Sequence, residues 1–190
     1  MKAVIIANGP SLTAEDVAYC RGRGLVIAVN DAYRLAPFAD VLYACDGDWW
    51  DHHVATTVEF RGSKWTADDE AARRYRLNHV KVRPDLVWST DHKAVAGGGN
   101  SGFQAINLAV HWGYKDIVLL GFDYQTGEDG EEHWFGAHPD GLRRQSQYRE
   151  WVRRIAKAAP LIEAAGARVT NCTRRTAITC FAKAELQESI

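Results

Sequence analysis

Residues 3–12 of the chain read AVIIANGPSL, and this stretch decides the fold class. Five apolar residues run without interruption from Ala3 to Ala7 and then stop at Asn8. A continuous apolar run predicts a strand buried on both faces, as in a parallel sheet. Thr13, with Asp16 three positions later, predicts a helix start directly after the turn. The opening residues therefore predict a strand, a tight turn and a helix in succession.

The same alternation of strands and helices continues along the chain. Buried strands are predicted at 25–29, 41–45 and 116–120, and a short last one ends at Val169. Residues 103–112 and 142–165 have helical spacing, with Pro160 predicting a kink in the second helix. Residues 50–96 are irregular beyond a helix-like stretch at 68–75 and strand candidates at 79–82. We therefore predict an α/β fold, a mostly parallel sheet with helices on both faces, in a single domain spanning 1–190.

Composition and charge exclude several classes of protein. The 190 residues carry a formal net charge of -1, which does not indicate general nucleic-acid binding. No apolar run approaches the roughly 20 residues of a membrane span, and the first residues lack the layout of a signal peptide. The four cysteines form no CxxC pair and complete no zinc pattern. We expect a cytoplasmic protein with reduced thiols and no membrane partner.

Polar residues follow the predicted strands at the points where these strands end. They are Asn8, Gly9, Pro10 and Ser11 after the first strand, Asn30 and Asp31 after the second, Asp46 and Asp48 after the third, and Asp123 and Tyr124 after the fourth. Ligands of open parallel sheets bind in the crevice beyond such ends. A helix start behind Ser11 would offer free backbone N–H groups to an anion such as phosphate. NGPS alone is also a common turn sequence, but the agreement of several strand ends favours a binding site.

The stretch GGGNSG at 97–102 is a second candidate for holding a phosphate or a sugar. Gly99 and Gly102 let the backbone approach a ligand closely, and Asn100 and Ser101 can hydrogen-bond it before the next helix. The stretch is neither a Walker A loop nor a GxGxxG motif after the first strand. A flexible linker is the alternative, and the helix that starts directly behind the loop argues against it.

The loop at 125–141 concentrates the side chains best suited to chemistry. His133 and His138 can titrate near neutral pH, and they flank the aromatic residues Trp134 and Phe135. Long loops in compact domains are often lids over a site. A surface loop with incidental histidines is the alternative, but two aromatic rings on an idle loop are unusual. We therefore predict a lid that carries a catalytic histidine.

Three motifs extend this interpretation: VIIANGPSL at 4–12, VND at 29–31 and NSGFQAINLAVHWGYKDIVLLGFDY at 100–124. Together they resemble the small bacterial sialyltransferases that use CMP-sialic acid, which are single-domain, Rossmann-like glycosyltransferases. The resemblance covers residues 3–46 and 100–180 and leaves the middle unmatched. The same layout is similar to the archaeal-type 6-hydroxymethylpterin diphosphokinases and to short phage proteins. The motifs are therefore specific for a superfamily and weak for a reaction.

The resemblance to the sialyltransferases implies roles for the matched residues. Asn8, Gly9 and Ser11 would contact the phosphate or ribose of the nucleotide, Asn30 the nucleotide or donor sugar, and Ser101 and Gly102 the donor. Asp123 would lie beside the nucleotide, and the Tyr124 hydroxyl would stabilise the leaving phosphate. His138 would be the base that takes the acceptor proton, with His133 as the alternative.

The carboxylates depart from this pattern. The residue after the third strand is usually Asn in the sialyltransferases and is Asp46 here. With Asp31, Asp48 and Asp123, the strand ends carry a surplus of carboxylates around an expected phosphate. That surplus suggests a bound divalent cation such as Mg²⁺, with Asp46 and Asp123 as its candidate ligands.

We therefore expect a transferase that uses a nucleotide or nucleotide-sugar donor, foremost a glycosyltransferase with a histidine base and a glycan or small-molecule acceptor. The first alternative is a Mg²⁺-dependent, pyrophosphokinase-type transfer from ATP to a small hydroxymethyl compound. The second alternative is a non-catalytic nucleotide-binding protein. Small nucleotide-dependent enzymes often self-associate, so a homo-oligomer stays open as well.

Overall fold

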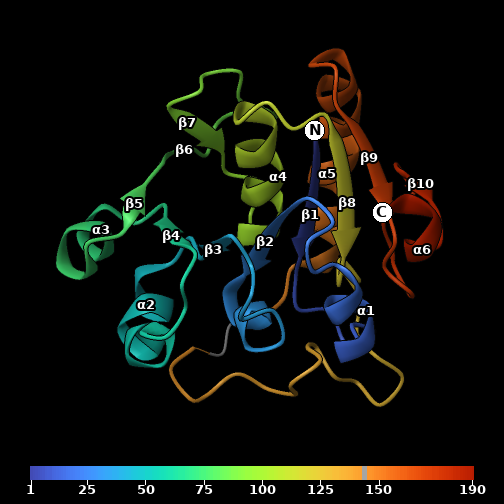
Figure 1. Ribbon diagram of the computed structural model, residues 1–190. Helices are drawn as coiled ribbons and strands as arrows, with labels where there is room; N and C mark the ends of the chain where they lie inside the picture. Colours follow the sequence, from blue (N-terminus) through green and yellow to red (C-terminus); the bar gives the residue numbers. More distant parts are fainter. Residues whose placement is uncertain (143–144) are drawn as a thin grey trace.

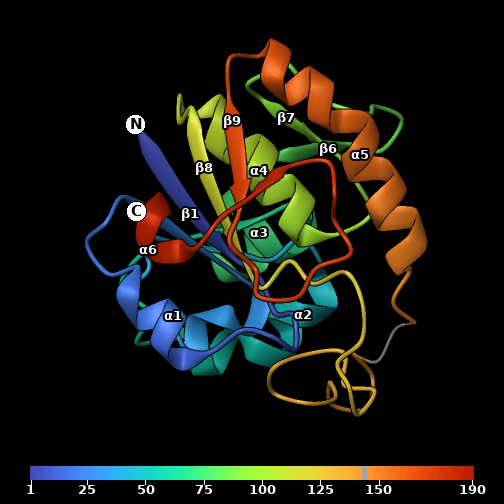
Figure 2. The ribbon, with the colours of Figure 1, turned by 90° about the vertical axis from the view of Figure 1, so that its right-hand side faces the viewer.

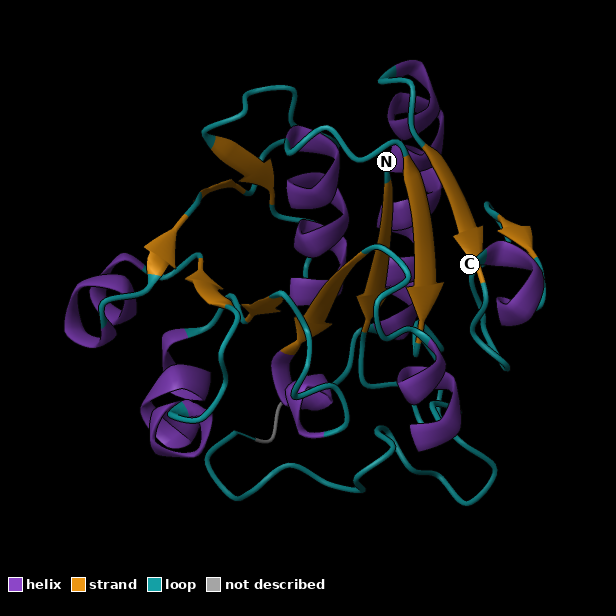
Figure 3. Ribbon diagram, viewed as in Figure 1, coloured by secondary structure: helices purple, strands orange, loops and turns teal. Residues whose placement is uncertain are grey.

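The computed structural model describes residues 1–142 and 145–190. Within these residues an eight-stranded sheet has the order β10-β9-β8-β1-β2-β3-β4-β5, and every neighbouring pair is parallel. Figure 3 shows β1, β8 and β9 pointing toward the same end of the molecule. The strands are β1 (Lys2–Ile6), β2 (Leu25–Val29), β3 (Val41–Tyr43), β4 (Ser63–Thr66), β5 (Asn78–His79), β8 (Asp116–Leu120), β9 (Arg168–Asn171) and β10 (Ala182–Lys183), while β6 (Lys81–Arg83) and β7 (Ala94–Ala96) pair separately.

Helices cover both faces of the sheet, with α4 and α5 on one side and α1 and α2 on the other (Figure 2). No helix in the described part of the chain combines the length and apolar character needed to cross a membrane. The helices are α1 (Ala14–Tyr19), α2 (Gly47–His53), α3 (Asp69–Tyr75), α4 (Ser101–His111), α5 (Tyr148–Ala164) and α6 (Leu186–Ser189), with short 3₁₀ turns η1 (Asn30–Arg34) and η2 (Val54–Thr57).

The central strand β1 explains the two cores. Ala3 and Ile5 point into the core under α4 and α5, whereas Val4 and Ile6 point into the core under α1 and α2. All four side chains are fully buried. Successive residues of a strand face opposite sides of the sheet, so a strand covered on both sides must be apolar throughout. The predicted α/β fold with helices on both faces is confirmed.

The elements agree with the sequence prediction where the apolar pattern is strong. The strands at 25–29 and 116–120 lie where predicted, and Thr13 caps α1 by accepting a hydrogen bond from the Asp16 N–H at 3.2 Å. The predicted start of the long helix at Leu142 is wrong, because α5 begins at Tyr148 and Leu142 lies in a turn. Residues 143–144 of that prediction lie outside the described residues. The predicted 41–45 strand ends at Tyr43, and the Cys45 N–H instead donates to Ser101 Oγ.

From β1 the chain adds strands first on one side of the sheet and later on the other, so β1 and β8 lie at a switch point in the strand order. The carboxyl ends of both strands lie beside one crevice there. From β1 the chain proceeds to β2 and β3 on one side, and only later returns to β8 on the other. In open α/β sheets this switch point is where ligands bind. Residues 125–142, coloured yellow to orange in Figure 1, cross this same end of the sheet.

Candidate functional site

A cavity of about 110 Å³ lies beyond the carboxyl ends of β1, β2 and β8, at the switch point. The start of α4 and the first turn of α5 complete its walls. The structure brings together many of the residues selected from the sequence. Those lining the cavity are Asn8, Gly9, Asn30, Asn100, Ser101, Gly102, Asp123, Tyr124 and His133.

The turn after β1 is built around a glycine that approaches Asp123. The Gly9 N–H donates to the Gly121 carbonyl at 2.8 Å, and the Ser11 N–H donates to Asp123 Oδ2 at 3.0 Å. A Cβ added at Gly9 would lie 1.8 Å from Asp123 Oδ1 and 2.7 Å from the Gly121 oxygen. Only glycine fits there, and the turn is therefore tied to the end of β8. The Ser11 N–H, expected to face a phosphate, is occupied by the Asp123 carboxylate.

Three buried polar atoms on residues lining this cavity have no hydrogen-bond partner among the described residues. They are Asn30 Oδ1, Asn100 Nδ2 and Asp123 Oδ1. Leaving a buried polar group unsatisfied costs about 1–3 kcal/mol, and native structures contain few such groups. Three of them, on three different segments around one cavity, make this cavity a candidate site for a polar ligand.

Two of the cavity residues have an unusual backbone. Asn30 and Tyr124 both have φ of 48°, in the left-handed region that non-glycine residues seldom occupy. Such conformations are often found where a site must aim a side chain. The Tyr124 hydroxyl donates to Asn100 Oδ1 at 3.0 Å, and burial raises the pKa of Tyr124. A phenol carries one proton, so Tyr124 must exchange this bond before it can donate to a leaving phosphate.

A second cavity, of about 280 Å³, adjoins the first and shares Asp123 and His133 with it. The predicted residues Pro10 and Ser11 line this second cavity, together with the loop at 126–136 and Arg175. Burial raises the pKa of Asp123, while the Ser11 hydrogen bonds and the Arg175 charge oppose that rise. Asp123 and His133 therefore stand at the boundary between two adjoining cavities.

The loop at 125–141 is fastened across the strand ends, as a lid would be. The Trp134 N–H donates to the Asn8 carbonyl at 3.2 Å, and Trp134 Nε1 donates to Asn8 Oδ1 at 3.3 Å. Asn8 Nδ2 in turn donates to the Val29 carbonyl at 2.9 Å. Arg175 and Glu128 form an ion pair at 2.8 Å farther along. The amide of Asn8, predicted to contact the nucleotide, thus joins β2 to the lid in this conformation.

The two lid histidines occupy different places. His133 lines both cavities described above, whereas His138 lines a separate hollow formed by the lid itself. Their rings are 4.5 Å apart, centroid to centroid. Burial and, to a smaller extent, the neighbouring His138 lower the pKa of His133 to about 4, although the Asp31 charge acts in the opposite direction. Of the two candidate bases, His133 is therefore the one that faces the cavity.

Other predicted residues lie outside the cavities at the switch point. Asp31 does not line the cavity and instead accepts a hydrogen bond from Trp49 Nε1 at 3.0 Å. Asp46 Oδ2 accepts a hydrogen bond from Cys45 Sγ at 3.2 Å. A Cβ at Gly99 would lie 3.0 Å from the Trp151 ring, so this glycine accommodates α5. Among the described residues, no group of three or more His, Cys, Asp or Glu side chains is arranged to hold a metal ion. Asp46 and Asp123 belong to no such group, and Mg²⁺ stays a prediction from the sequence.

Sequence reasoning missed the contribution of α5 to the cavity. Tyr148 and Trp151, three residues apart and hence on one helix face, line it together with Gln125 and Glu132. The Trp151 ring lies 5.8 Å from the ring of Tyr124. The aromatic spacing at the beginning of the predicted helix was the available signal, and the misplaced helix start at Leu142 concealed it.

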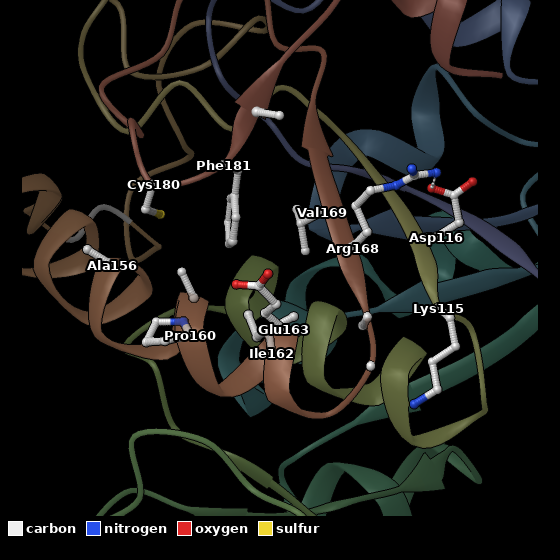
Figure 4. Close-up of a pocket in the computed structure, with 14 residues that line it drawn as sticks. Lys115, Asp116, Ala156, Pro160, Ile162, Glu163, Arg168, Val169, Cys180 and Phe181 are labelled. Carbon is white, nitrogen blue, oxygen red and sulfur yellow. Dashed lines mark hydrogen bonds and ion pairs between the residues drawn. The ribbon is translucent and has the colours of Figure 1, made fainter.

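A larger hollow lies elsewhere in the structure. An open groove of about 820 Å³ runs between α5 and the strands β9 and β10 (Figure 4). Val169 and Phe181 face the helix residues Pro160 and Ile162 across it. Lys115 and Asp116 mark the amino end of β8, opposite the end where α/β sheets bind their ligands. Despite its smaller volume, the cavity at the switch point is therefore the candidate site.

Comparisons with known proteins agree with the fold. No protein-family model and no curated protein matches the chain in sequence. In structure, the chain is similar to the MAf glycosyltransferase from Magnetospirillum magneticum AMB-1, with a TM-score of 0.70 and 17% sequence identity. The match covers 98% of this chain and 34% of that protein, so the chain spans about a third of its length. At this identity the likeness shows a shared Rossmann-like α/β fold.

Proposed function

We propose that this chain is a transferase that binds a nucleotide-activated sugar at the β1–β8 switch point and transfers the sugar to an acceptor hydroxyl. The observation that carries the proposal is the set of three unsatisfied buried polar atoms around one cavity, on Asn30, Asn100 and Asp123. The fold shared with a protein described as a glycosyltransferase supports the same reaction class. The resemblance of the NGPS and NSG motifs to sialyltransferases favours a cytidine nucleotide.

The size of the cavity constrains how the donor binds. Small-molecule sites usually have volumes of about 300–1,000 Å³, whereas the cavity at the switch point holds about 110 Å³. The adjoining cavity adds about 280 Å³ and shares the boundary formed by Asp123 and His133. A nucleotide sugar therefore extends over both cavities, with the lid displaced from its present contacts as the donor enters.

The proposed chemistry uses His133 as the general base. The acceptor O–H bond breaks and its proton passes to His133, while the acceptor oxygen bonds to the anomeric carbon of the donor. The bond from that carbon to the nucleotide phosphate breaks, and the nucleotide leaves with the electron pair. The N-terminus of α4 beside the cavity stabilises the departing negative charge. A neutral histidine is needed at the outset, and with its pKa lowered to about 4 His133 is neutral at neutral pH, although the same shift makes it a weaker base than an ordinary histidine.

A ligand panel tests binding. We expect CMP or CMP-sialic acid to raise the melting temperature more than CDP, UDP, GDP or ATP, and to do so in EDTA as well as in Mg²⁺. A shift with ATP only in the presence of Mg²⁺ would instead favour the pyrophosphokinase-type transfer. If no nucleotide shifts the wild-type protein, the switch-point cavity is not a nucleotide site and the proposal fails.

Asn30→Gly gives the sharpest test of the site. Glycine adopts the φ of 48° without strain while the whole asparagine side chain, methylene and amide, is removed, so the fold should survive. Loss of one polar contact to the ligand should weaken nucleotide binding about tenfold. Arg76→Gly is the matched control, because Arg76 has φ of 55° but is exposed at the end of α3. Equal nucleotide affinity in the two variants would remove Asn30 from the site.

His133→Ala and His138→Ala then separate the two candidate bases. We expect His133→Ala to bind nucleotide normally and to lose most of its transfer rate, by a factor of about 100 or more. His138→Ala should retain more of that rate, because His138 does not line either cavity at the switch point. The opposite order of the two rates would assign the base to His138.

A further inference from the structure

Arg175 follows β9 and lines the second cavity, the one of about 280 Å³. The loop that carries it is fastened to the core. The Phe122 N–H donates to Thr173 Oγ1 at 2.9 Å, and Thr176 Oγ1 donates to the Phe122 carbonyl at 2.7 Å. The Arg175 N–H itself donates to Ser11 Oγ at 3.3 Å. The backbone of Arg175 is therefore held against the segments that follow β1 and β8.

The charges that line this cavity are divided between the core and the lid. Three carboxylates of the lining, on Glu128, Asp129 and Glu131, belong to the lid. The core contributes Arg175 and the carboxylate of Asp123, one of whose oxygens already accepts a backbone N–H at 3.0 Å. A donor that displaces the lid would therefore remove three carboxylates from the cavity and leave the Arg175 cation in its wall.

Arg175 is paired with one of these lid carboxylates. Its Nη1 lies 2.8 Å from Glu128 Oε1, and the two side chains are 48% and 82% exposed. An ion pair between groups so exposed contributes little to stability, because water and salt screen it. A phosphate or carboxylate can form two parallel hydrogen bonds to one guanidinium, which is a stronger arrangement. An anionic group that enters the cavity can therefore take the place of Glu128.

We propose that Arg175 binds an anionic group of the donor and that Glu128 of the lid competes with this group for the guanidinium. This inference rests on the proposed function, in which the donor extends over both cavities and displaces the lid. The ligand is a phosphate or a sugar carboxylate, because both present the same pair of oxygens to a guanidinium. The N-terminus of α4 lies at the first cavity, so an anion in the second cavity needs a separate cation, which Arg175 supplies.

Neutral substitutions of the two partners distinguish this competition from a simple ion pair. Arg175→Gln should weaken donor binding about tenfold, because a charge-assisted hydrogen bond is lost. Glu128→Gln should strengthen donor binding by about threefold, because the competitor is lost. Both variants should quicken chymotrypsin cleavage of the lid to the same extent, since each removes the same ion pair. A pair that only holds the lid would instead change donor affinity in the same direction in both variants.

Two control variants match these substitutions. Arg168→Gln removes an exposed guanidinium that pairs with Asp116 at 3.3 Å, at the opposite end of the sheet. Asp129→Asn removes a lid carboxylate of the same cavity that is not the partner of Arg175. Both controls should leave donor affinity within twofold of the wild type.

Calorimetric titrations with CMP, CDP and CMP-sialic acid identify the anion. A loss of affinity in Arg175→Gln with CMP-sialic acid alone assigns a sugar carboxylate to Arg175, and a loss that CMP or CDP shows as well assigns a phosphate. If the wild type binds these ligands and Arg175→Gln binds all three equally well, the inference is overturned while the proposed function stands. A change in the same direction in Arg175→Gln and Glu128→Gln would overturn it too.

Inorganic phosphate tests Arg175 without a nucleotide. At millimolar concentration it should displace Glu128 and so quicken lid cleavage in the wild type, with sodium chloride of equal ionic strength as the reference. Arg175→Gln should show no such response, and an equal response in the two proteins would refute the competition. This assay judges Arg175 even if the nucleotide panel refutes the proposed transfer.

Discussion

Gly9→Ala is the substitution for which the structure gives the clearest quantitative expectation. The new methyl carbon would lie 1.8 Å from Asp123 Oδ1, whereas ordinary contacts begin at 3.4 Å. The carboxylate must therefore move by at least about 1.5 Å. The methyl group cannot move away instead, because the Gly121 carbonyl oxygen lies only 2.7 Å from it. Two free-energy costs follow from this crowding.

The first cost is the bond from the Ser11 N–H to Asp123 Oδ2, at 3.0 Å, which the moving carboxylate gives up. A hydrogen bond to a charged group contributes about 1.5–3 kcal/mol. The second cost is overpacking against the β8 backbone, typically about 1–3 kcal/mol. We expect the free energy of unfolding to fall by about 3–5 kcal/mol and Tm by about 6–20 °C for a chain of this size.

Urea denaturation and thermal melting measure both quantities. Gly102→Ala is the comparison variant, because the nearest neighbours of its methyl group would be the Phe122 ring edge at 3.0 Å and Asn100 Oδ1 at 3.2 Å. The gain in helix propensity, about 1 kcal/mol, offsets that contact, so Gly102→Ala should stay within about 1 kcal/mol of the wild type. A Gly9→Ala protein as stable as Gly102→Ala would refute the described packing of the turn against Asp123.

Three further predictions concern other parts of the site and its support. Asp16→Asn removes the charge that pairs with Arg174 in the loop after β9, so it should lower the free energy of unfolding by about 1–2 kcal/mol at pH 7. Burial raises the pKa of Asp16, but the hydrogen bonds and charge of Arg174 and the Thr13 hydrogen bond lower it by more. The stability difference between wild type and variant should therefore shrink as the pH falls below 3.8, which thermal melts at a series of acidic pH values measure. Trp134→Phe removes the hydrogen bond from Trp134 Nε1 to Asn8, so limited proteolysis should cleave the lid about five times faster. An unchanged cleavage rate would show that this bond does not hold the lid. The pKa of His133 is about 4 when folded and about 6.5 when unfolded, so the unfolded chain binds more protons between these values and stability should decline as pH falls through them. His133→Gln should flatten that decline in denaturation curves, and exposed His52→Gln should leave it unchanged.

The sheet could be predicted from sequence because its strands are covered on both faces. Such strands have no polar side for the chain to present, so runs such as 25–29 and 116–120 leave a clear apolar signal. The short, partly exposed strands of the middle, for example Asn78–His79, carry no such signal. Two or three residues of exposed strand depend on neighbours for their conformation, and local sequence does not encode those neighbours.

In the candidate site, too, some features could be predicted from the sequence and others could not. Residues at strand ends, such as Asn8 and Asn30, could be placed because parallel strands deliver their carboxyl ends to one edge. The side-chain partners could not, since they depend on contacts between distant segments. Asp123 was expected to face a nucleotide, yet one of its oxygens holds the turn after β1. Asp31 follows β2 as directly as Asn30 does, but η1 turns it toward Trp49 and away from the cavity.

Under the proposed function, Asn8 would connect the binding of a donor to the position of the lid. Its amide donates to the end of β2 and accepts from Trp134, so one side chain holds the lid at the place where the turn meets the cavity. A cavity of about 110 Å³ cannot hold a nucleotide sugar while these bonds persist. In the proposed function, a donor that enters the cavity would release Asn8 Oδ1 from Trp134 and so free a hydrogen-bond acceptor beside the ligand. The contact that closes the lid in this structure and the contact expected for the nucleotide thus compete for one side chain.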